Sequence, residues 1–387
     1  MKHFEEKAYL CALNRIFGFE PKTALALLEH FGSASEVFAL NEKELDLILG
    51  PYSKHRRSIC LRAAEKEARE LETLAGKGIS FTGWTEKEYP ELLRQCEDAP
   101  VGLYVRSSTP VEELFKARRE IAVVGTRNIS FYGKEWCRKT VSAFAGTAEK
   151  PRIISGLAFG TDICAHRTAL EEGLETIAVM ATGPDDIYPR QHRDIAMQIS
   201  RTPGCALVTD YPPGTAPLAI HFLRRNRIIA GLSGSLLLIE SRVKGGGMMT
   251  SRLAFSYNRD VYALPGRVDD PVSQGCNYLI KSKIAEPVIS LETLMESLGL
   301  TSVKSPGNDR WRDGLEREYG ERFSRDKVDK MAEMLLAIRK ERGIPLDTLC
   351  SRCSIGYNEA VTLAGMLEAD GFISMDMLHR CTIPSGK

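Results

Sequence analysis

Six short apolar runs along the middle of the chain constrain its fold more than any other feature of the sequence. Each run is almost continuously hydrophobic, and segments with helical periodicity separate them. Strands buried on both faces of a parallel sheet have this pattern. With right-handed crossovers through the intervening helices, we predict an α/β protein with a Rossmann-like, doubly wound parallel sheet. The predicted strands are 121–124, 152–155, 176–180, 206–209, 235–239 and 261–264.

Glycine-containing turns follow several of these predicted strands directly. The clearest are 125–127 (GTR), 155–162 (SGLAFGTD) and 245–247 (GGG). In an open parallel sheet the carboxyl ends of the strands form the ligand crevice. A helix that begins after a tight glycine turn offers free backbone N–H groups and the positive end of its dipole, which suits a phosphate. We therefore predict a phosphate site at this edge of the sheet.

A cationic segment, 219–229 (AIHFLRRNRII), comes just before the predicted strand 235–239. It contains Arg224, Arg225, Asn226 and Arg227. Residues 221–252 include six Lys or Arg and one acid, whereas the whole chain carries a net charge of +1. Because the positive charge is concentrated at one place, the sequence predicts an anionic and polymeric partner.

The alternative for these arginines is a solvated helix face. Arg127, Lys244 and Arg252 are expected near the same carboxyl edge of the sheet, and no acids are interleaved to neutralise them. We therefore favour phosphate binding by this cluster.

Sequence motifs for nucleotide enzymes are missing from the chain. Gly133-Lys134 is followed by Glu135 without the earlier glycine of a Walker A loop, so an ATP-driven motor is disfavoured. The first predicted strand is followed by GTR instead of G-x-G-x-x-G, so a nicotinamide dehydrogenase fits poorly.

Candidate catalytic or metal-binding residues are few. Asp162 and His166 are spaced i,i+4, but no third ligand or nucleophile joins them, so we expect a helix N-cap at Asp162 and a structural hydrogen bond. Cys350 and Cys353 form a CxxC with no second pair, which is weak evidence for zinc. We predict no catalytic residue, no cofactor and no metal.

The periodicity divides the chain into segments. Residues 1–75 predict a small all-helical domain similar to SAM or helix-hairpin-helix modules, and residues 76–300 contain the Rossmann-like core. Residues 301–326 are polar and charge-mixed, which predicts a linker. Residues 327–387 predict three helices and a hairpin, the order of a winged helix.

The third helix of that tail, 358–369, would be the groove-binding helix of a winged helix. It carries acids and no Lys or Arg, so we favour a structural or protein-contact role for it. The ten cysteines are scattered, which fits a reducing compartment, and no apolar stretch is long enough to span a membrane. We expect a soluble, cytoplasmic protein.

Read in order, a series of motifs between residues 123 and 280 resembles the DNA-processing protein A (DprA/Smf) family. These motifs include VVGTR (123–127), SGLAFGTDICAH (155–166), YPPGTAP (211–217), FLRRNRIIAGLS (222–233) and GGGMMTSRLA (245–254). The flanking helical domain and winged-helix-like tail also fit larger members of that family.

The resemblance implies a non-catalytic protein that binds single-stranded DNA, protects incoming strands during natural transformation and loads the RecA recombinase. It also implies a homodimer formed through the Rossmann-like core. From the motifs and the local charge, the expected DNA contacts are Gly125, Thr126, Arg127, Gly156, Arg224, Arg225, Asn226, Arg227 and Lys244.

An enzyme that acts on a nucleoside phosphate remains the alternative. A Rossmann-like core with a late GGG-x-x-T loop is also similar to the cytokinin-activating phosphoribohydrolases. Those enzymes carry an acid soon after the glycine loop, whereas Gly247 is followed here by the segment 248–252 (MMTSR). The sequence therefore favours DNA binding.

Overall fold

The computed structural model describes residues 4–301, 310–320, 322–341, 343–376 and 378–383. The chain forms two compact units, Met1–Val303 and Lys304–Lys387.

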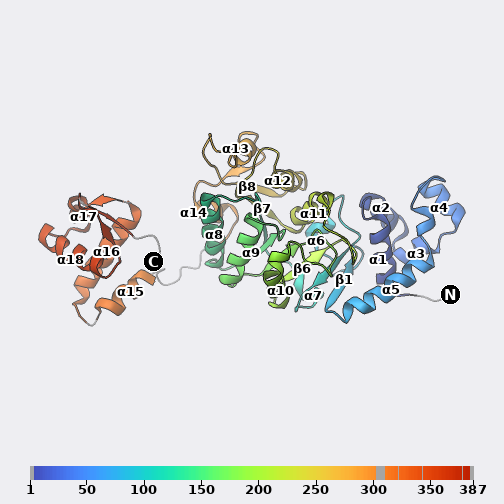
Figure 1. Cartoon of the computed structure of the whole chain (residues 1–387), viewed down its shortest axis with the longest axis horizontal. Coiled ribbons are helices and arrows are strands. Elements are labelled where there is room, and N and C mark those ends of the chain that lie inside the picture. The colour runs from blue at the N-terminus through green and yellow to red at the C-terminus, as the bar shows by residue number, and fades with distance from the viewer. Residues whose placement is uncertain (1–3, 302–309, 321, 342, 377, 384–387) are drawn as a thin grey trace. The chain divides into compact units, whose positions relative to one another are not determined.

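Within the described residues, the first unit is built around a nine-stranded sheet with the order β1-β2-β6-β5-β4-β3-β7-β8-β9 (Figure 1). The strands are β1 Ile79–Gly83, β2 Gly102–Arg106, β3 Glu120–Val124, β4 Arg152–Ser155, β5 Thr176–Val179, β6 Ala206–Thr209, β7 Ser235–Leu238, β8 Asp260–Ala263 and β9 Glu286–Pro287. In the order of the sheet, all neighbouring strands from β6 through β5, β4, β3, β7 and β8 to β9 pair in parallel. At the other end, β1 pairs with β2 and β2 with β6 in antiparallel orientation.

The six strands predicted from the apolar runs are confirmed as β3 to β8, with ends within one residue of the prediction. Strands β1, β2 and β9 were not predicted from the sequence. The last of these has two residues, Glu286 and Pro287, both exposed, so it carries no apolar signal.

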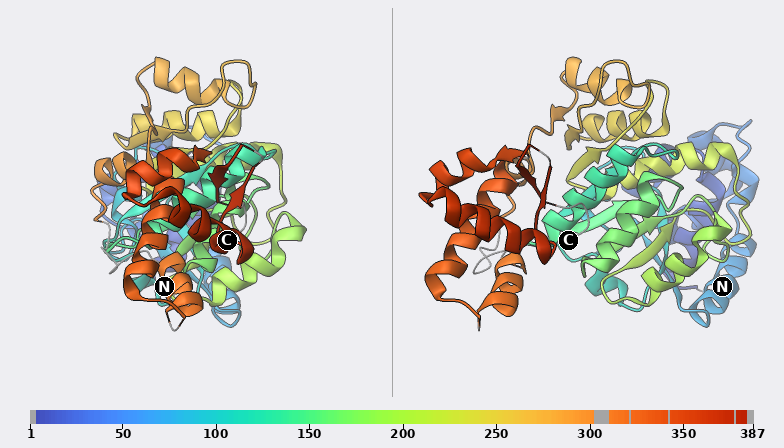
Figure 2. Two further views of the ribbon diagram at one scale, coloured as in Figure 1. Left: turned by 90° about the vertical axis from the view of Figure 1, so that its left-hand side faces the viewer. Right: turned by 60° about the vertical axis from the view of Figure 1, so that its left-hand side comes forward.

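Helices cover both faces of the parallel sheet (Figure 2). The helical segments of the first unit are α1 Glu6–Phe17, α2 Pro21–Phe31, α3 Ala34–Ala39, α4 Glu42–Leu49, the 3-10 helix η1 Arg56–Ser58, α5 Leu61–Ala75, α6 Glu91–Arg94, α7 Val111–Leu114, α8 Phe131–Ala145, α9 Thr161–Glu171, the 3-10 helix η2 Arg190–His192, α10 Arg193–Arg201, α11 Ala219–Leu232, α12 Gly246–Ser256, α13 Gln274–Lys281 and α14 Leu291–Ser297.

The alternation of side chains along β3 shows why this strand is apolar throughout. Ile121 and Val123 pack into a cluster with residues of α8 and α9. Ala122 and Val124 pack on the other face, with residues of α11 and α12. A strand between two helical layers has no solvated face, so every position along it is apolar.

The order of the strands creates a switch point between β3 and β7. The chain proceeds from β3 to β4 on one side, whereas β7 pairs with β3 on the other side. In such sheets the crossovers diverge at this point and leave a crevice at the carboxyl ends of the two strands. The loops that begin at Gly125 and at Ile239 therefore meet at this crevice.

The N-terminal helical region, α1 to α5, packs directly against β1 and β2. Phe81 of β1 and Tyr104 of β2 belong to the hydrophobic cluster of these helices. Asn14 of α1 donates a hydrogen bond to the carbonyl of Asp210 over 2.8 Å and accepts one from the backbone N–H of Gly102 over 3.3 Å. The structure thus groups the helical region with the sheet in one unit, although the sequence predicts a boundary after residue 75.

The second unit has its own hydrophobic cluster. Its elements are α15 Arg310–Tyr319, α16 Arg325–Lys340, β10 Ile344–Pro345, α17 Leu346–Cys353, α18 Tyr357–Ala369, β11 Ser374–Met375 and β12 Arg380–Thr382. The predicted three helices and hairpin are confirmed as α16 to α18 with β11 and β12, and β10 completes a small antiparallel sheet.

The predicted linker, 301–326, needs correction. Residues 302–309 lie outside the described residues, but residues 310–319 form helix α15. The apolar side chains Leu315 and Tyr319, one helical turn apart, are buried in the core of the second unit. The sequence does carry a helical spacing here, since Trp311, Leu315 and Tyr319 are four residues apart, but the many charged residues around them hid this periodicity.

Candidate nucleic-acid interface

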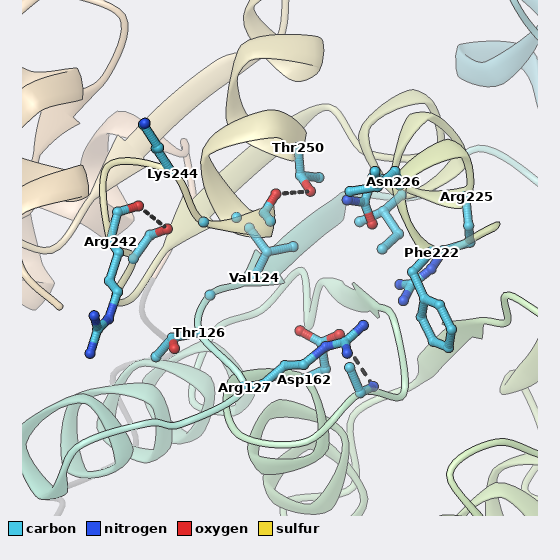
Figure 3. A pocket seen from close by; sticks show the side chains of 18 residues that line it. Val124, Thr126, Arg127, Asp162, Phe222, Arg225, Asn226, Arg242, Lys244 and Thr250 are labelled. Carbon is cyan, nitrogen blue, oxygen red and sulfur yellow. Dashed lines mark hydrogen bonds between the residues drawn. The ribbon is translucent and has the colours of Figure 1, made fainter. Parts of the chain in front are cut away.

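A pocket of about 310 Å³ opens at the carboxyl ends of β3 and β7, at the switch point of the sheet (Figure 3). It is lined by the loop after β3, the start of α9, the helix α11 and the glycine turn at the start of α12. Its polar lining residues are Thr126, Arg127, Asp162, Arg225, Asn226, Ser241, Arg242, Lys244 and Thr250, together with Gly125 and Gly245 to Gly247.

The two glycine loops touch each other at the floor of this pocket. A Cβ atom at Gly125 would lie 2.4 Å from Oγ1 of Thr161, and a Cβ at Gly247 would lie 3.3 Å from the Cα of Gly125. Any side chain at position 125 would therefore separate the loop from the start of α9. The absence of side chains brings the backbone of both loops to the pocket surface.

Helix α12 begins at the pocket without a side-chain cap. Gly245 is its N-cap residue and makes no side-chain hydrogen bond to the first turn. The first backbone N–H groups of a helix have no intrahelical acceptor, and the helix dipole adds partial positive charge there. These donors suit an anion held in the pocket.

Glu240, the one acid of the cationic stretch, holds the first glycine loop in place. It is 1% exposed, and its Oε2 accepts a hydrogen bond of 2.9 Å from the backbone N–H of Ser130, while Oε1 accepts from the Ser130 hydroxyl. The same Ser130 is the N-cap of α8, since its Oγ accepts from the backbone N–H of Gly133 over 3.1 Å. Glu240 thus fixes the end of the loop that carries Arg127.

Arg127 is exposed on that loop and lies against an aromatic ring. Its guanidinium carbon is 4.8 Å from the centroid of the Phe222 ring, which belongs to α11. Figure 3 shows the guanidinium of Arg127 close to Asp162 and on the same side of the pocket as Arg225. The stacked ring orients this guanidinium but leaves its N–H donors available to an anion.

Arg225 is buried, with 3% of its surface exposed, and it lines the pocket. Within the described part of the chain, its Nε and Nη1 have no hydrogen-bond partner. Burial lowers the pKa of this guanidinium to about 10, with the charge of Asp162 opposing the shift and that of Arg127 adding to it. The side chain therefore stays cationic at neutral pH while part of its hydrogen-bonding capacity is unmet, which favours an anionic ligand.

Asp162 faces these arginines from the start of α9. Burial raises its pKa, and the positive charge of Arg225 partly offsets that shift. The prediction that it caps the helix was wrong, because Gly160 is the N-cap and Asp162 Oδ2 accepts from the backbone N–H of Ala158 instead, over 3.3 Å. The predicted structural hydrogen bonds are present, since Asp162 accepts from Ala158 and Nδ1 of His166 pairs with Oγ1 of Thr176 over 2.8 Å.

Arg227 lies outside the pocket, in the protein interior. It is 6% exposed, and Nη2 donates to the carboxylate of Asp210 while Nη1 donates to the carbonyl of Asp98. Arg224 points to a third place, where its guanidinium carbon is 4.2 Å from the centroid of the Phe19 ring in the helical region. Three arginines within one helical turn thus have three different environments.

Of the nine predicted contact residues, the structure brings six together in the pocket. These are Gly125, Thr126, Arg127, Arg225, Asn226 and Lys244. Lys244 is exposed at the rim, and Figure 3 shows it across the pocket from Arg225. Gly156 lies beneath the guanidinium of Arg225, since a Cβ there would be 1.5 Å from Nη1, whereas Arg224 and Arg227 lie elsewhere.

Phe222, Arg242 and Thr250 also line the pocket, although they were not predicted as site residues from the sequence. Phe222 and Thr250 stand in the motifs that marked the site, so their position was available from the sequence, but the direction of their side chains was not. The solvated-face alternative for the arginine cluster is contradicted by the burial of Arg225 and Arg227. Among the described residues, no group of three or more His, Cys, Asp or Glu is arranged to hold a metal ion.

These features define an α/β protein with a pocket lined by cationic side chains and glycine loops at the switch point of a Rossmann-like sheet. A family model described as DNA recombination-mediator protein A matches residues 80–299. The chain belongs to this family, which is also named DprA/Smf.

Relatives and solved structures agree with this assignment. Protein Smf of Escherichia coli (strain K12) is 34% identical over 290 residues, which are 74% of this chain and 72% of that relative. The X-ray structure of DNA processing protein A from Streptococcus pneumoniae superposes with a TM-score of 0.63 and 28% identity, covering 76% of this chain and 98% of that chain.

A second solved structure concerns the single-stranded DNA binding mode of DNA processing protein A from Helicobacter pylori. It matches with a TM-score of 0.50 and 26% identity, and covers 57% of this chain and 95% of that chain. In the part of the chain that the structure describes, no helix is both long and apolar enough to span a membrane.

Proposed function

We propose that this protein binds single-stranded DNA through phosphates held in the switch-point pocket, without catalysing a reaction on the strand. The observation that carries the proposal is the buried guanidinium of Arg225, whose Nε and Nη1 have no partner among the described residues, next to the exposed Arg127. Two glycine loops and the start of α12 supply backbone donors at the same place. The structure from Helicobacter pylori, described by its single-stranded DNA binding mode, supports the choice of polymer.

The contacts that we propose are made by backbone and side chains with different tasks. Gly125 and Thr126 present the first loop, Arg127 and Lys244 supply exposed charge, and Asn226 adds an amide. Arg225 supplies a desolvated charge, and a charge-assisted hydrogen bond from such a group is roughly twice as strong as a neutral one. We assign Gly156 a supporting role, and Arg227 no direct contact.

A fluorescence-polarisation titration tests this function. Labelled single-stranded DNA, a duplex of the same sequence and a mononucleotide are compared over a range of salt concentrations. Phosphate binding to a single strand requires log affinity to fall with log salt by about 0.7 per phosphate contact. Binding that does not depend on salt, or a preference for the duplex, would contradict the proposal.

We further propose that the bound strand is passed to a RecA-type recombinase in the cytoplasm, and that the protein acts as a homodimer through its sheet core. The family described as a DNA recombination mediator supports the first step. Two pockets on one strand would raise affinity beyond that of either alone. Assembly of RecA on strands coated with single-strand-binding protein should therefore accelerate when this protein is added, and sedimentation should show a dimer. If RecA assembly is not accelerated, the proposed transfer to the recombinase is wrong. If the protein sediments as a monomer at tens of micromolar, the proposed homodimer is wrong.

A further inference from the structure

A second pocket, of about 620 Å³, lies between the N-terminal helical region and the sheet core. Its walls come from residues 19–23 at the start of α2, from α11, and from α12. Leu223 of α11 lines both this apolar pocket and the switch-point pocket. The two pockets are therefore neighbours across one side chain, and a single extended ligand can reach both.

Large apolar side chains are exposed around the apolar pocket. Phe19 is 55% exposed, Ile220 47%, Leu223 42% and Met249 41%. They come from three segments that are far apart in the sequence. Clustered apolar exposure of this kind marks a binding surface, because single scattered apolar residues carry no such meaning.

Arg224 gives this apolar pocket a cationic edge. Its guanidinium lies over the Phe19 ring, with 4.2 Å from its carbon to the ring centroid. It also donates to the carbonyl of Phe19 over 3.2 Å and to the carbonyl of Gly18. These contacts hold the ring and the charge together, so the pocket offers a flat apolar face beside a positive charge.

Resting on the proposed function, we infer that the apolar pocket takes a nucleobase of the strand whose phosphates occupy the switch-point pocket. A base presents a flat π-face to Phe19 and to the apolar side chains, while its own phosphate meets the charge of Arg224. Arg227, at the same pocket, is already bonded to Asp210 and Asp98. The base is therefore held by its face, without selection of one base over another.

Two truncations test this inference, with the full chain and a labelled single strand. Phe19→Ala and Met249→Ala each remove an exposed side chain of the apolar pocket. Phe19→Ala removes the ring on which the base stacks, so it should lower the affinity for the strand by about five- to 150-fold. The dependence of affinity on salt should stay unchanged because no phosphate contact is lost. Phe19→Trp should restore binding. Leu47→Ala, which truncates an 86% exposed residue of the same helical region, is the matched control and should bind as the wild type does.

Binding of an abasic strand, which has the phosphates but no bases, distinguishes loss of base stacking from an indirect effect of the substitution on the protein. The wild type should bind an abasic strand more weakly than a natural strand, and Phe19→Ala should narrow that difference. If Phe19→Ala and Met249→Ala bind the natural strand like the wild type while Arg127→Ala weakens it, the base site is wrong and the proposed function stands. If the wild type itself binds no single strand, the proposed function fails first.

Discussion

The guanidinium of Arg225 occupies the space that a side chain at position 156 would need. An ideal Cβ at Gly156 would lie 1.5 Å from Nη1 and 2.4 Å from Cζ of Arg225. The glycine directly after β4 thus lets an arginine of α11 lie over the end of the strand and line the pocket from below. The glycine of the second motif thus makes room for a cation at the pocket.

Gly156→Ala should weaken single-stranded DNA binding without removing any charge. The added methyl group displaces the guanidinium of Arg225, and we expect a loss of about 1.5–3 kcal/mol in binding free energy, the range for one hydrogen bond to a charged group. Fluorescence polarisation with a labelled strand measures this loss. Gly234→Ala is the matched control, because the nearest atom to a Cβ there is 4.0 Å away. Equal affinity of both variants and the wild type would show that the position of Arg225 is unimportant.

Removal of the acid Glu240 should weaken DNA binding, although simple charge counting predicts the opposite. Glu240→Ala leaves the N–H and hydroxyl of Ser130 without their acceptor and releases the loop that carries Arg127. We expect the free energy of unfolding to fall by about 1–3 kcal/mol. Denaturant unfolding and strand titration are measured together.

Ser130→Ala serves as the comparison for Glu240→Ala, since it removes one partner of the same interaction. The double variant Glu240→Ala, Ser130→Ala should lower the free energy of unfolding by less than the sum of the two single losses, as expected for residues in contact. An increase in affinity for Glu240→Ala would mean that its negative charge matters more than its hold on the loop.

Arg227→Ala should destabilise the protein far more than Arg127→Ala. It leaves the carboxylate of Asp210, 6% exposed, without its partner, and breaking a buried ion pair in this way costs about 3–5 kcal/mol. Arg127 is exposed, so its removal should cost affinity and leave the unfolding midpoint nearly unchanged. Urea unfolding checks both, and the double variant Arg227→Met, Asp210→Asn should recover part of the loss. A small effect of Arg227→Ala on stability would refute the structural role.

Much of the fold could be predicted because its signals are local. The strands β3 to β8 are apolar on both faces, and glycine turns mark where they end. The pocket could be located for the same reason, since parallel strands place their carboxyl ends together. Strands β1 and β2 were missed, although both are largely buried, because they pair antiparallel, β1 with β2 and β2 with β6, and so lie outside the alternation of parallel strands and helices.

The separate tasks of the arginines could not be predicted, because they depend on distant parts of the chain. Arg224 meets Phe19, Arg225 meets Gly156, and Arg227 meets Asp210. Helical spacing gives the direction of each side chain from α11, but it does not say what lies in that direction. Local charge counting therefore led to the switch-point pocket, but it overestimated the number of arginines that line this pocket.

His166 should make the protein less stable in mild acid. Thr176 donates its hydroxyl proton to the carbonyl of Ile153 over 2.8 Å, so its Oγ1 accepts from Nδ1–H of His166, and Nε2 has no partner among the described residues. Burial, followed by the charges of Arg225 and His192, lowers the pKa of His166 to about 3. In the unfolded chain the His166 imidazole has a pKa of 6.5 and binds a proton below that pH, whereas the buried imidazole of the folded chain stays neutral. The free energy of unfolding therefore falls as the pH drops from 6.5 towards 3.

The size of this effect is about 1.4 kcal/mol for each pH unit below the unfolded pKa. Between about pH 7 and about pH 5, the free energy of unfolding of the wild type should fall by about 2 kcal/mol more than that of His166→Gln, which has no imidazole to protonate. Urea unfolding of both proteins at the two pH values gives the difference. A constant difference between wild type and variant across this range would contradict the lowered pKa.

Deletion of the second unit, residues 304–387, should leave single-strand affinity within about a factor of three, or roughly 0.7 kcal/mol. The switch-point pocket lies wholly in the first unit, and α18 carries the acids Glu359 and Glu368 without a Lys or Arg. Lys330 of α16 is bonded to Glu359, so its charge is already neutralised. A strand titration of the truncated protein, with circular dichroism to verify its fold, measures the change. A hundredfold loss in the folded fragment would place a DNA contact in the second unit, with Arg380 of β12 as the first residue to substitute.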